Sequence, residues 1–106
     1  MKLVKQKTSS TCGQACVAML KQISLDAAVE LVGHKTCTSD EEILTALGLS
    51  GPFTEGKPSN KIVALQKHRD PNGDKEHWTV SCYGKLFDPA QIGANLWPVF
   101  KFIKVR

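Results

Sequence analysis

The sequence predicts an α+β domain, with helices from the first half of the chain packed on a small antiparallel sheet from the second half. Three observations favour this class. Residues 12–48 carry apolar positions at helical spacing, residues 61–105 carry short β-rich runs separated by turns, and residues 49–60 between them show no periodicity. With 106 residues, the chain is expected to form one domain, 1–106, around a single core.

Three helices are expected in the first half. The first begins at Cys12, and apolar residues follow at helical spacing as one stripe: Ala15, Cys16, Met19, Leu20 and Ile23. Thr11 and Gln14 have the spacing of a capping box at its start. The other two are expected within residues 24–33 and 39–48, because each segment opens with a serine cap and closes on glycine.

The second half is expected to form strands. Apolar or alternating runs predict four of them, at residues 61–66, 77–83, 86–88 and 99–105. The sequence of residues 70–74, Asp-Pro-Asn-Gly-Asp, predicts a turn after the first strand, and Gly84-Lys85 predicts a tight turn after the second. The expected arrangement is an antiparallel meander in chain order.

Cys12 lies where a polar loop turns into an apolar helix, at what is expected to be an exposed helix tip. Unpaired N–H groups and the positive end of the helix dipole favour the thiolate there. With a cationic partner, the pKa of such a thiol falls from about 8.5 to roughly 3.5–7.5. Gly13 is expected to leave the approach to the sulfur open, and Gln6 to offer its side-chain amide to a developing oxyanion. Cys12 is therefore a candidate nucleophile.

A thiol nucleophile needs an imidazole within hydrogen-bond reach, and the imidazole needs a third group that fixes its tautomer. The chain has three histidines. His34 lies in a connector between helices, and His68 is flanked by a lysine and an arginine that would lower its basicity. His77 begins a strand and is the candidate base.

The carboxylate that would orient His77 is not selected by spacing. If the hairpin turn is centred on Gly84-Lys85, Asp88 lies four residues along the hairpin from His77, or about 13 Å at strand rise. That register does not bring the two together. Asp88, Asp70 and Asp74 are then equal candidates.

Composition excludes several classes of protein. The chain has no apolar block typical of a secretion signal and no run long enough to span a membrane, so it is expected to be cytoplasmic, or a domain excised from a larger secreted protein. Its net charge of +4 comes from scattered lysines and arginines, which is typical of a solvated surface, so nucleic acid is the less favoured partner.

The four cysteines have poor spacing for a metal site, with gaps of 21 and 45 residues and no CxxC pair, so neither a metal nor another cofactor is expected. Disulfides are not expected in a chain without a secretion signal. Cys16, Cys37 and Cys82 are instead expected to be small buried hydrophobic residues.

Three motifs, in order along nearly the whole chain, resemble the bacteriocin-processing cysteine peptidase domain of ABC exporters. They are Gln6 with Cys12-Gly-Gln-Ala-Cys-Val-Ala-Met-Leu20, His77-Trp-Thr-Val80 and Leu86-Phe-Asp-Pro89. The resemblance implies a papain-like fold and cleavage of leader peptides after a double glycine. Matched residue by residue, it implies Cys12 as nucleophile, His77 as general base, Asp88 as the residue that orients the histidine, and Gln6 as oxyanion-hole donor.

The chain departs from this family in three respects, one of which is that it is shorter than the usual domain. Thr11 stands where the family often has an acidic residue, and the chain carries no transporter, so neither the double-glycine preference nor an export role is transferred. Similar small papain-like domains occur free-standing in phage and bacterial proteins and as toxin modules, some of which use the cleft for deamidation or group transfer.

The predicted function is that of a thiol hydrolase, a cysteine peptidase acting on a peptide or protein substrate. The alternative is a papain-like toxin or binding domain that acts on RNA or a protein partner without peptidase activity. A toxin would have an immunity or inhibitor protein as a further partner.

Overall fold

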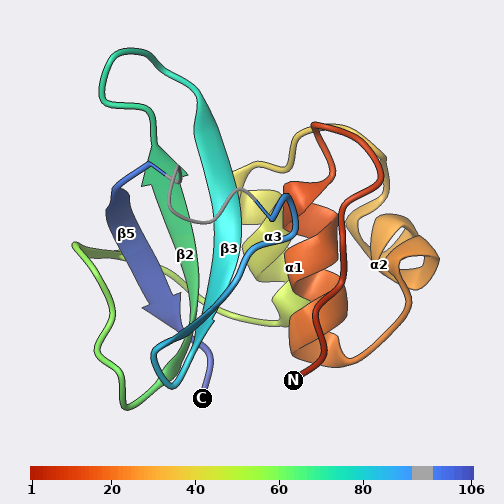
Figure 1. Ribbon diagram of the computed structural model, residues 1–106. Coiled ribbons are helices and arrows are strands. Elements are labelled where there is room, and N and C mark those ends of the chain that lie inside the picture. Colours follow the sequence, from red (N-terminus) through yellow and green to blue (C-terminus); the bar gives the residue numbers. More distant parts are fainter. Residues whose placement is uncertain (92–96) are drawn as a thin grey trace.

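The computed structural model describes residues 1–91 and 97–106. Within these residues it contains three helices and one five-stranded antiparallel sheet, which confirms the predicted α+β class. The helices are α1 (Cys12–Lys21), α2 (Leu25–Val32) and α3 (Asp40–Leu47), and the strands are β1 (Thr54–Glu55), β2 (Val63–Arg69), β3 (Glu76–Cys82), β4 (Lys85–Phe87) and β5 (Val99–Lys104). The helices form one layer and the sheet the other (Figure 1).

Helix α1 is the central element. It contacts α2, α3 and strand β3, and every residue from Cys12 to Leu20 is buried, including those outside the predicted apolar stripe. A helix buried on all sides must be apolar throughout or have its polar groups satisfied. The long polar side chain in this buried stretch, Gln14, donates through Nε2 to the carbonyls of His34 at 2.9 Å and Thr36 at 2.8 Å. It thereby ties the connector between α2 and α3 to α1.

The predicted capping box at the start of α1 is wrong. The Thr11 side chain makes no cap hydrogen bond, and its backbone is not extended. Its hydroxyl instead donates to the carbonyl of Thr8 at 3.2 Å. Gln14 is unavailable for a box because its amide is bound to the α2–α3 connector.

The predicted boundaries of the other two helices are confirmed. Ser24 caps α2, and Ser39 forms the full capping box with Glu42 at the start of α3. Gly33 and Gly48 follow the helices in left-handed conformation, as their positions at the C-terminal ends require. No helix among the residues that the structure describes is long and apolar enough to cross a membrane.

The sheet has the strand order β1-β5-β2-β3-β4, so the predicted meander is wrong. Strands β2, β3 and β4 do follow one another as predicted, but β5 pairs with β2 and covers the edge that a meander would leave open. β1 lies within the segment that was expected to be irregular. A strand of two residues is too short to show a period in the sequence.

The hairpin between β3 and β4 differs from its prediction by one residue. Val80 pairs with Phe87, and the two turn residues are Tyr83 and Gly84, both with positive φ, as in a two-residue hairpin turn. Moving the turn by one residue changes the register by two. Continued past the end of β4, this register brings Asp88 two residues closer to the start of β3 than predicted.

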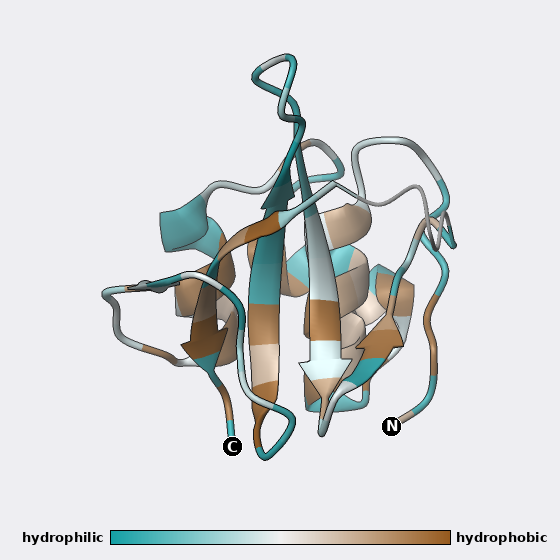
Figure 2. Ribbon diagram, turned by 60° about the vertical axis from the view of Figure 1, so that its left-hand side comes forward, coloured by the Kyte–Doolittle hydropathy of each residue, from teal (hydrophilic) through white to brown (hydrophobic). Residues whose placement is uncertain are grey.

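The turn predicted at residues 70–74 is confirmed. Asp70 N–H donates to the carbonyl of Lys75 at 2.9 Å and closes the loop between β2 and β3. Figure 2 shows that this loop projects beyond the sheet and is hydrophilic. It rises beyond the end of the sheet at which β3 begins (Figure 1).

Candidate active site

Cys12, His77 and Asp88 come from three elements that meet at one end of the interface between the layers. Cys12 is the first residue of α1, His77 the second residue of β3, and Asp88 directly follows β4. A cleft of about 650 Å³ opens there, lined by Cys12 and His77 together with Gln6 and Trp97. The structure thus brings together the residues that the sequence proposed as a site.

His77 and Asp88 form a buried pair. His77 Nε2 lies 2.7 Å from Asp88 Oδ1, and the same oxygen accepts the N–H of Ala90 at 3.0 Å. An ionised carboxylate can only accept, so His77 Nε2 carries the proton. The other ring nitrogen, Nδ1, is then left for the thiol of Cys12.

The hairpin register explains how Asp88 reaches His77. Val80 lies opposite Phe87, so continuing this register by one residue beyond β4 puts Asp88 across from Thr79, two residues from His77 on the same face of the strand. Diagonal neighbours of this kind lie roughly 7–8 Å apart at Cα, within the reach of an aspartate and a histidine side chain.

Interactions with His77 lower the pKa of Cys12. Burial opposes ionisation of the thiol, but its hydrogen bond and charge interaction with His77, and hydrogen bonds with the backbone of Trp78 and Gly13, outweigh that effect. For His77, burial acts to lower the pKa, but the interactions with Cys12 and Asp88 raise it. The two shifts have opposite signs, and both favour a thiolate beside an imidazolium.

Cys12 is not the exposed tip that was expected. Only 8% of the residue is exposed, so the sulfur lies at the inner end of the cleft. Gly13 also has a different role, because a Cβ there would lie 2.6 Å from Thr38 Oγ1 and 2.7 Å from Thr38 Cβ. Glycine therefore lets the segment before α3 pack against the start of α1, instead of leaving the approach to the sulfur open.

Gln6 reaches the cleft on the arm that precedes α1. Its N–H donates to the carbonyl of Pro89 at 3.1 Å, which fixes the arm beside Asp88. Its Nε2 donates one hydrogen to the carbonyl of Thr8 at 2.8 Å and retains a second. Its Oε1 is buried and has no hydrogen-bond partner among the described residues.

The backbone of α1 offers a second donor near the sulfur. The first intrahelical hydrogen bond of α1 runs from Ala15 N–H to Thr11 O at 3.0 Å. The N–H of Cys12 precedes it and has no acceptor within the helix. It therefore complements Gln6 Nε2 as a donor for a developing oxyanion.

The remaining cysteines differ in exposure, and all four cysteines are free. Cys16 is buried as expected, and burial, together with the charges of Cys12 and Asp88, raises the pKa of its thiol well above the usual value. Cys37 is exposed and lines the cleft, and Cys82 is half-buried, so the expectation of burial is wrong for Cys37 and only partly met for Cys82.

Of the other candidate acid and base residues, Asp74 lines the same cleft and the ring of His68 lies 6.3 Å from that of His77, but the carboxylate that binds His77 is Asp88. His34 pairs through Nε2 with Glu42, and Asp70 closes the loop between β2 and β3. His68 is buried, and burial lowers its pKa. The predicted cause was its cationic neighbours, which is wrong because side chains alternate along a strand, and Lys67 Nζ is directed to Asp40 and Glu76.

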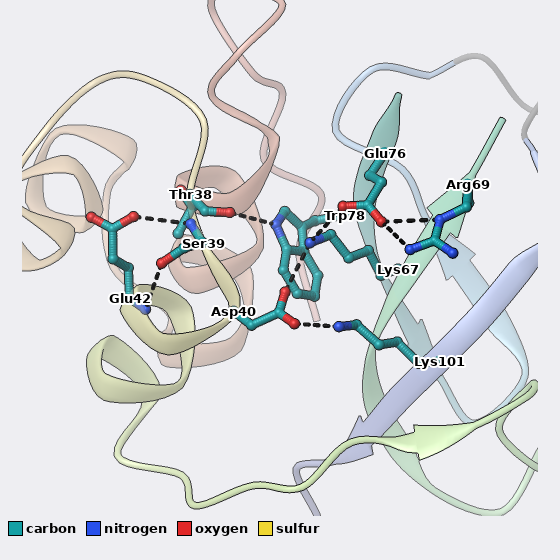
Figure 3. A network of polar contacts seen from close by, with 9 residues as sticks. All are labelled: Thr38, Ser39, Asp40, Glu42, Lys67, Arg69, Glu76, Trp78 and Lys101. Atoms are coloured by element: carbon teal, nitrogen blue, oxygen red, sulfur yellow. Dashed lines mark hydrogen bonds and ion pairs between the residues drawn. The ribbon is translucent and has the colours of Figure 1, made fainter. Parts of the chain in front are cut away.

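A polar network that sequence spacing did not reveal joins the two layers beside the cleft (Figure 3). Trp78 Nε1 donates to the carbonyl of Thr38 at 3.2 Å. Lys67 Nζ lies 2.8 Å from Asp40 Oδ1 and 3.0 Å from Glu76 Oε1, and 4.4 Å from the centre of the Trp78 ring. Together with Gln14, these contacts fix the segment before α3 between Cys12 on α1 and His77 on β3.

No signal in the sequence identifies this network. Its members are far apart in the sequence: Asp40 and Lys67 are separated by 27 residues, Thr38 and Trp78 by 40, and Asp40 and Lys101 by 61. Lys67, Asp40 and Thr38 each have the residue type of an ordinary surface position, and only the packing of the layers makes them neighbours.

The described residues contain no group of three or more histidine, cysteine, aspartate or glutamate side chains arranged to hold a metal ion. Compared with protein-family models, curated proteins and solved structures, the chain gives no significant match.

Proposed function

We propose that this chain is a thiol hydrolase of papain-like fold, a cysteine peptidase that cleaves a peptide or protein substrate. The observation that carries the proposal is the hydrogen-bonded series Cys12, His77 and Asp88 at one end of an open cleft. The opposite pKa shifts of Cys12 and His77 supply the thiolate that such chemistry needs.

In the acylation step the Cys12 thiolate attacks the carbonyl carbon of the scissile bond. The negative charge that forms on the carbonyl oxygen is stabilised by hydrogen bonds from Gln6 Nε2 and from the N–H of Cys12. The His77 imidazolium then donates its Nδ1 proton to the leaving amine, and the carbon–nitrogen bond breaks. The products of this step are an amine and a thioester on Cys12.

In the deacylation step a water molecule attacks the thioester. Neutral His77 accepts a proton from the water, the carbon–sulfur bond breaks, and the carboxylic acid leaves. Asp88 holds the Nε2 proton throughout, so Nδ1 stays directed at the sulfur and the imidazolium is stabilised each time it forms. The thiolate and imidazolium are thereby regenerated.

The alternative, a papain-like toxin or binding domain without peptidase activity, makes a different prediction for the thiol. A domain that only binds RNA or a protein gains nothing from an ionised Cys12, so its thiol pKa would be ordinary. The lowered pKa of Cys12 supports the hydrolase. Salt-sensitive RNA binding would support the alternative.

The experiment that tests the proposal measures the rate of iodoacetamide alkylation at each cysteine from about pH 4 to 9, by mass spectrometry, in the wild type and in His77→Ala. Cys12 should label rapidly well below neutral pH, and this labelling should slow in the variant. Cys37, exposed in the same cleft, is the internal control, and its profile should be the same in both proteins. An ordinary, unchanged profile at Cys12 would refute the hydrolase.

Peptidase activity is tested separately with fluorescein-labelled casein as substrate. The wild type should release labelled fragments, and Cys12→Ala should release none. If Cys12 has a lowered pKa but casein and a panel of internally quenched peptides stay intact, the thiol performs another acyl-transfer reaction, such as deamidation, and the peptidase assignment is wrong.

A further inference from the structure

Trp97 forms one wall of the cleft, and its backbone is held from β2. The half-buried residue lines the same cleft as Cys12 and His77. His68 Nδ1 lies 2.6 Å from the carbonyl oxygen of Trp97, and the N–H of Arg69 donates to the next carbonyl, that of Pro98, at 3.1 Å. Two successive carbonyls are therefore fixed by the end of β2.

A β-bulge lies directly beside this attachment. Lys67 pairs with Lys101, but His68 pairs with Val99, so Phe100 is the extra residue on β5. A bulge bends its strand and redirects the side chains next to it. Here it changes the direction of β5 where that strand approaches the cleft, and the contact with His68 lies at the same point.

The hydrogen bonds around His68 allow only one tautomer of the neutral ring. A carbonyl oxygen can only accept, so His68 Nδ1 carries the proton that binds Trp97. His68 Nε2 lies 2.7 Å from Thr79 Oγ1, which accepts from Gln66 Nε2 at 2.9 Å and donates its own hydrogen to His68. Gln66, Thr79, His68 and the Trp97 carbonyl thus form one directed series of hydrogen bonds.

His68 does not act as a second catalytic base. Its ring centre lies 6.3 Å from that of His77, it is 3% exposed, and both its nitrogens are already hydrogen-bonded. A buried imidazole with two fixed partners is suited to holding structure in place. The Trp97 carbonyl is the partner that belongs to the wall of the cleft.

We propose that His68 is a positioning residue that fixes Trp97 as a specificity-determining wall of the substrate cleft. This inference rests on the proposed hydrolase function. An acyl group large enough to extend along the cleft contacts the indole, whereas a small acyl group that reaches only Cys12 does not. His68 therefore affects the choice of substrate more than the chemistry at the sulfur.

Three variants separate these roles. His68→Asn keeps a side-chain N–H near the place of Nδ1, His68→Leu has the same size as asparagine without the donor, and Trp97→Ala removes the wall itself. The substrates are the p-nitrophenyl esters of acetate and of N-benzyloxycarbonyl-alanine, which differ in the size of the acyl group.

In His68→Leu and in Trp97→Ala, we expect KM for the larger ester to rise about fivefold to tenfold, as loss of one well-placed contact would give. The preference for that ester over acetate should fall by the same factor. The double variant with His68→Leu and Trp97→Ala should have a KM for the larger ester no higher than that of Trp97→Ala alone. In His68→Asn, KM should lie close to the wild-type value. A fall in kcat at unchanged KM, or a changed alkylation profile of Cys12 in His68→Leu, would show that His68 acts on His77 and would overturn the proposal.

A second measurement does not depend on activity. The fluorescence of Trp97 is obtained as the difference between the wild type and Trp97→Phe, in the presence and absence of acrylamide. Trp97 should become more accessible to the quencher in His68→Leu and return toward the wild-type value in His68→Asn. Unchanged quenching in His68→Leu overturns the positioning role. If neither ester acylates the wild type, the hydrolase function fails, and the quenching result still decides whether His68 holds Trp97.

Discussion

Replacing Asp88 by asparagine tests the charge of the site separately from its geometry. Asp88 Oδ1 accepts from both His77 Nε2 at 2.7 Å and the N–H of Ala90 at 3.0 Å. An asparagine oxygen can accept the same two hydrogen bonds, and Ala90 keeps that oxygen, rather than the amide nitrogen, facing His77. Asp88→Asn therefore removes the negative charge and leaves the tautomer of His77 in place.

The size of the effect follows from the pKa of His77. An opposite charge at this distance shifts a pKa by about 1–3 units, and both side chains here are less than 10% exposed, so solvent screens the interaction little. Without the charge, the pKa of His77 falls and that of Cys12 rises, because the imidazolium supports the thiolate. We expect kcat/KM near neutral pH to fall about tenfold to a hundredfold, less than when an asparagine substitution also imposes the wrong tautomer, which costs about 10⁴-fold.

The assay is the pH profile of Cys12 alkylation, with kcat/KM for an activated ester as the second readout. The alkylation profile of Cys12 should move to higher pH. The pH above which ester hydrolysis declines should move to lower values, so the pH range in which the variant is active becomes narrower at both ends. Asp88→Ala should lower kcat/KM further than Asp88→Asn does, because it also removes the hydrogen-bond acceptor for His77 Nε2. A profile in Asp88→Asn that matches the wild type would refute the role of the charge.

Two further predictions concern the contacts around the site. Gly13→Ala should destabilise the fold by about 1–3 kcal/mol in urea denaturation, because its Cβ would clash with Thr38 at 2.6 Å. Lys67→Met should weaken the response of stability to acid. Burial acts to raise the pKa of Asp40, but Lys101 and Lys67 hold that pKa below the usual value. The ionised Asp40 therefore contributes its full stabilisation above the unfolded-state pKa of about 3.9. This stabilisation is lost as the pH falls through the lower folded-state pKa. The free energy of unfolding, measured between pH 5 and pH 2, should therefore change less in the variant.

Each of these variants has a matched control. Gly51→Ala adds a Cβ whose nearest contact outside its own loop is Leu44 Cδ1 at 3.7 Å. It should therefore lower the free energy of unfolding much less than Gly13→Ala does. Lys61→Met removes the same charge and side chain at an exposed position. Equal losses at Gly13 and Gly51, or equal acid responses in the wild type and Lys67→Met, would contradict the packing and the network described above.

The ends of α2 and α3 could be predicted from the sequence. Ser24, Ser39 and the glycines after the helices mark chain ends by interactions within a few residues, and the structure has these caps where they were predicted. The same reasoning failed at Thr11 and Gln14. There the predicted capping box does not form, because the Gln14 amide binds carbonyls 20 and 22 residues away instead.

The sheet shows the same division between local and distant interactions. The hairpin between β3 and β4 was predicted, but its register depended on one turn residue, because the turn consists of Tyr83 and Gly84 and not of Gly84 and Lys85. The pairing of β5 with β2 had no local signal. Strand order depends on which edge the returning chain covers, and spacing in the sequence carries no information on that choice.

By itself, the sequence determined that a cysteine begins an apolar helix, that a histidine begins a strand, and that an aspartate ends the next one, because each depends on neighbours a few residues away. Only the tertiary structure decided that Cys12 and His77 meet in one cleft with Gln6, and that Asp88 binds His77 there. The packing of α1 on the sheet and the register of the hairpin set those distances. The pKa shifts follow from the same contacts, since charge interactions at hydrogen-bond distance arise only once the two layers are packed.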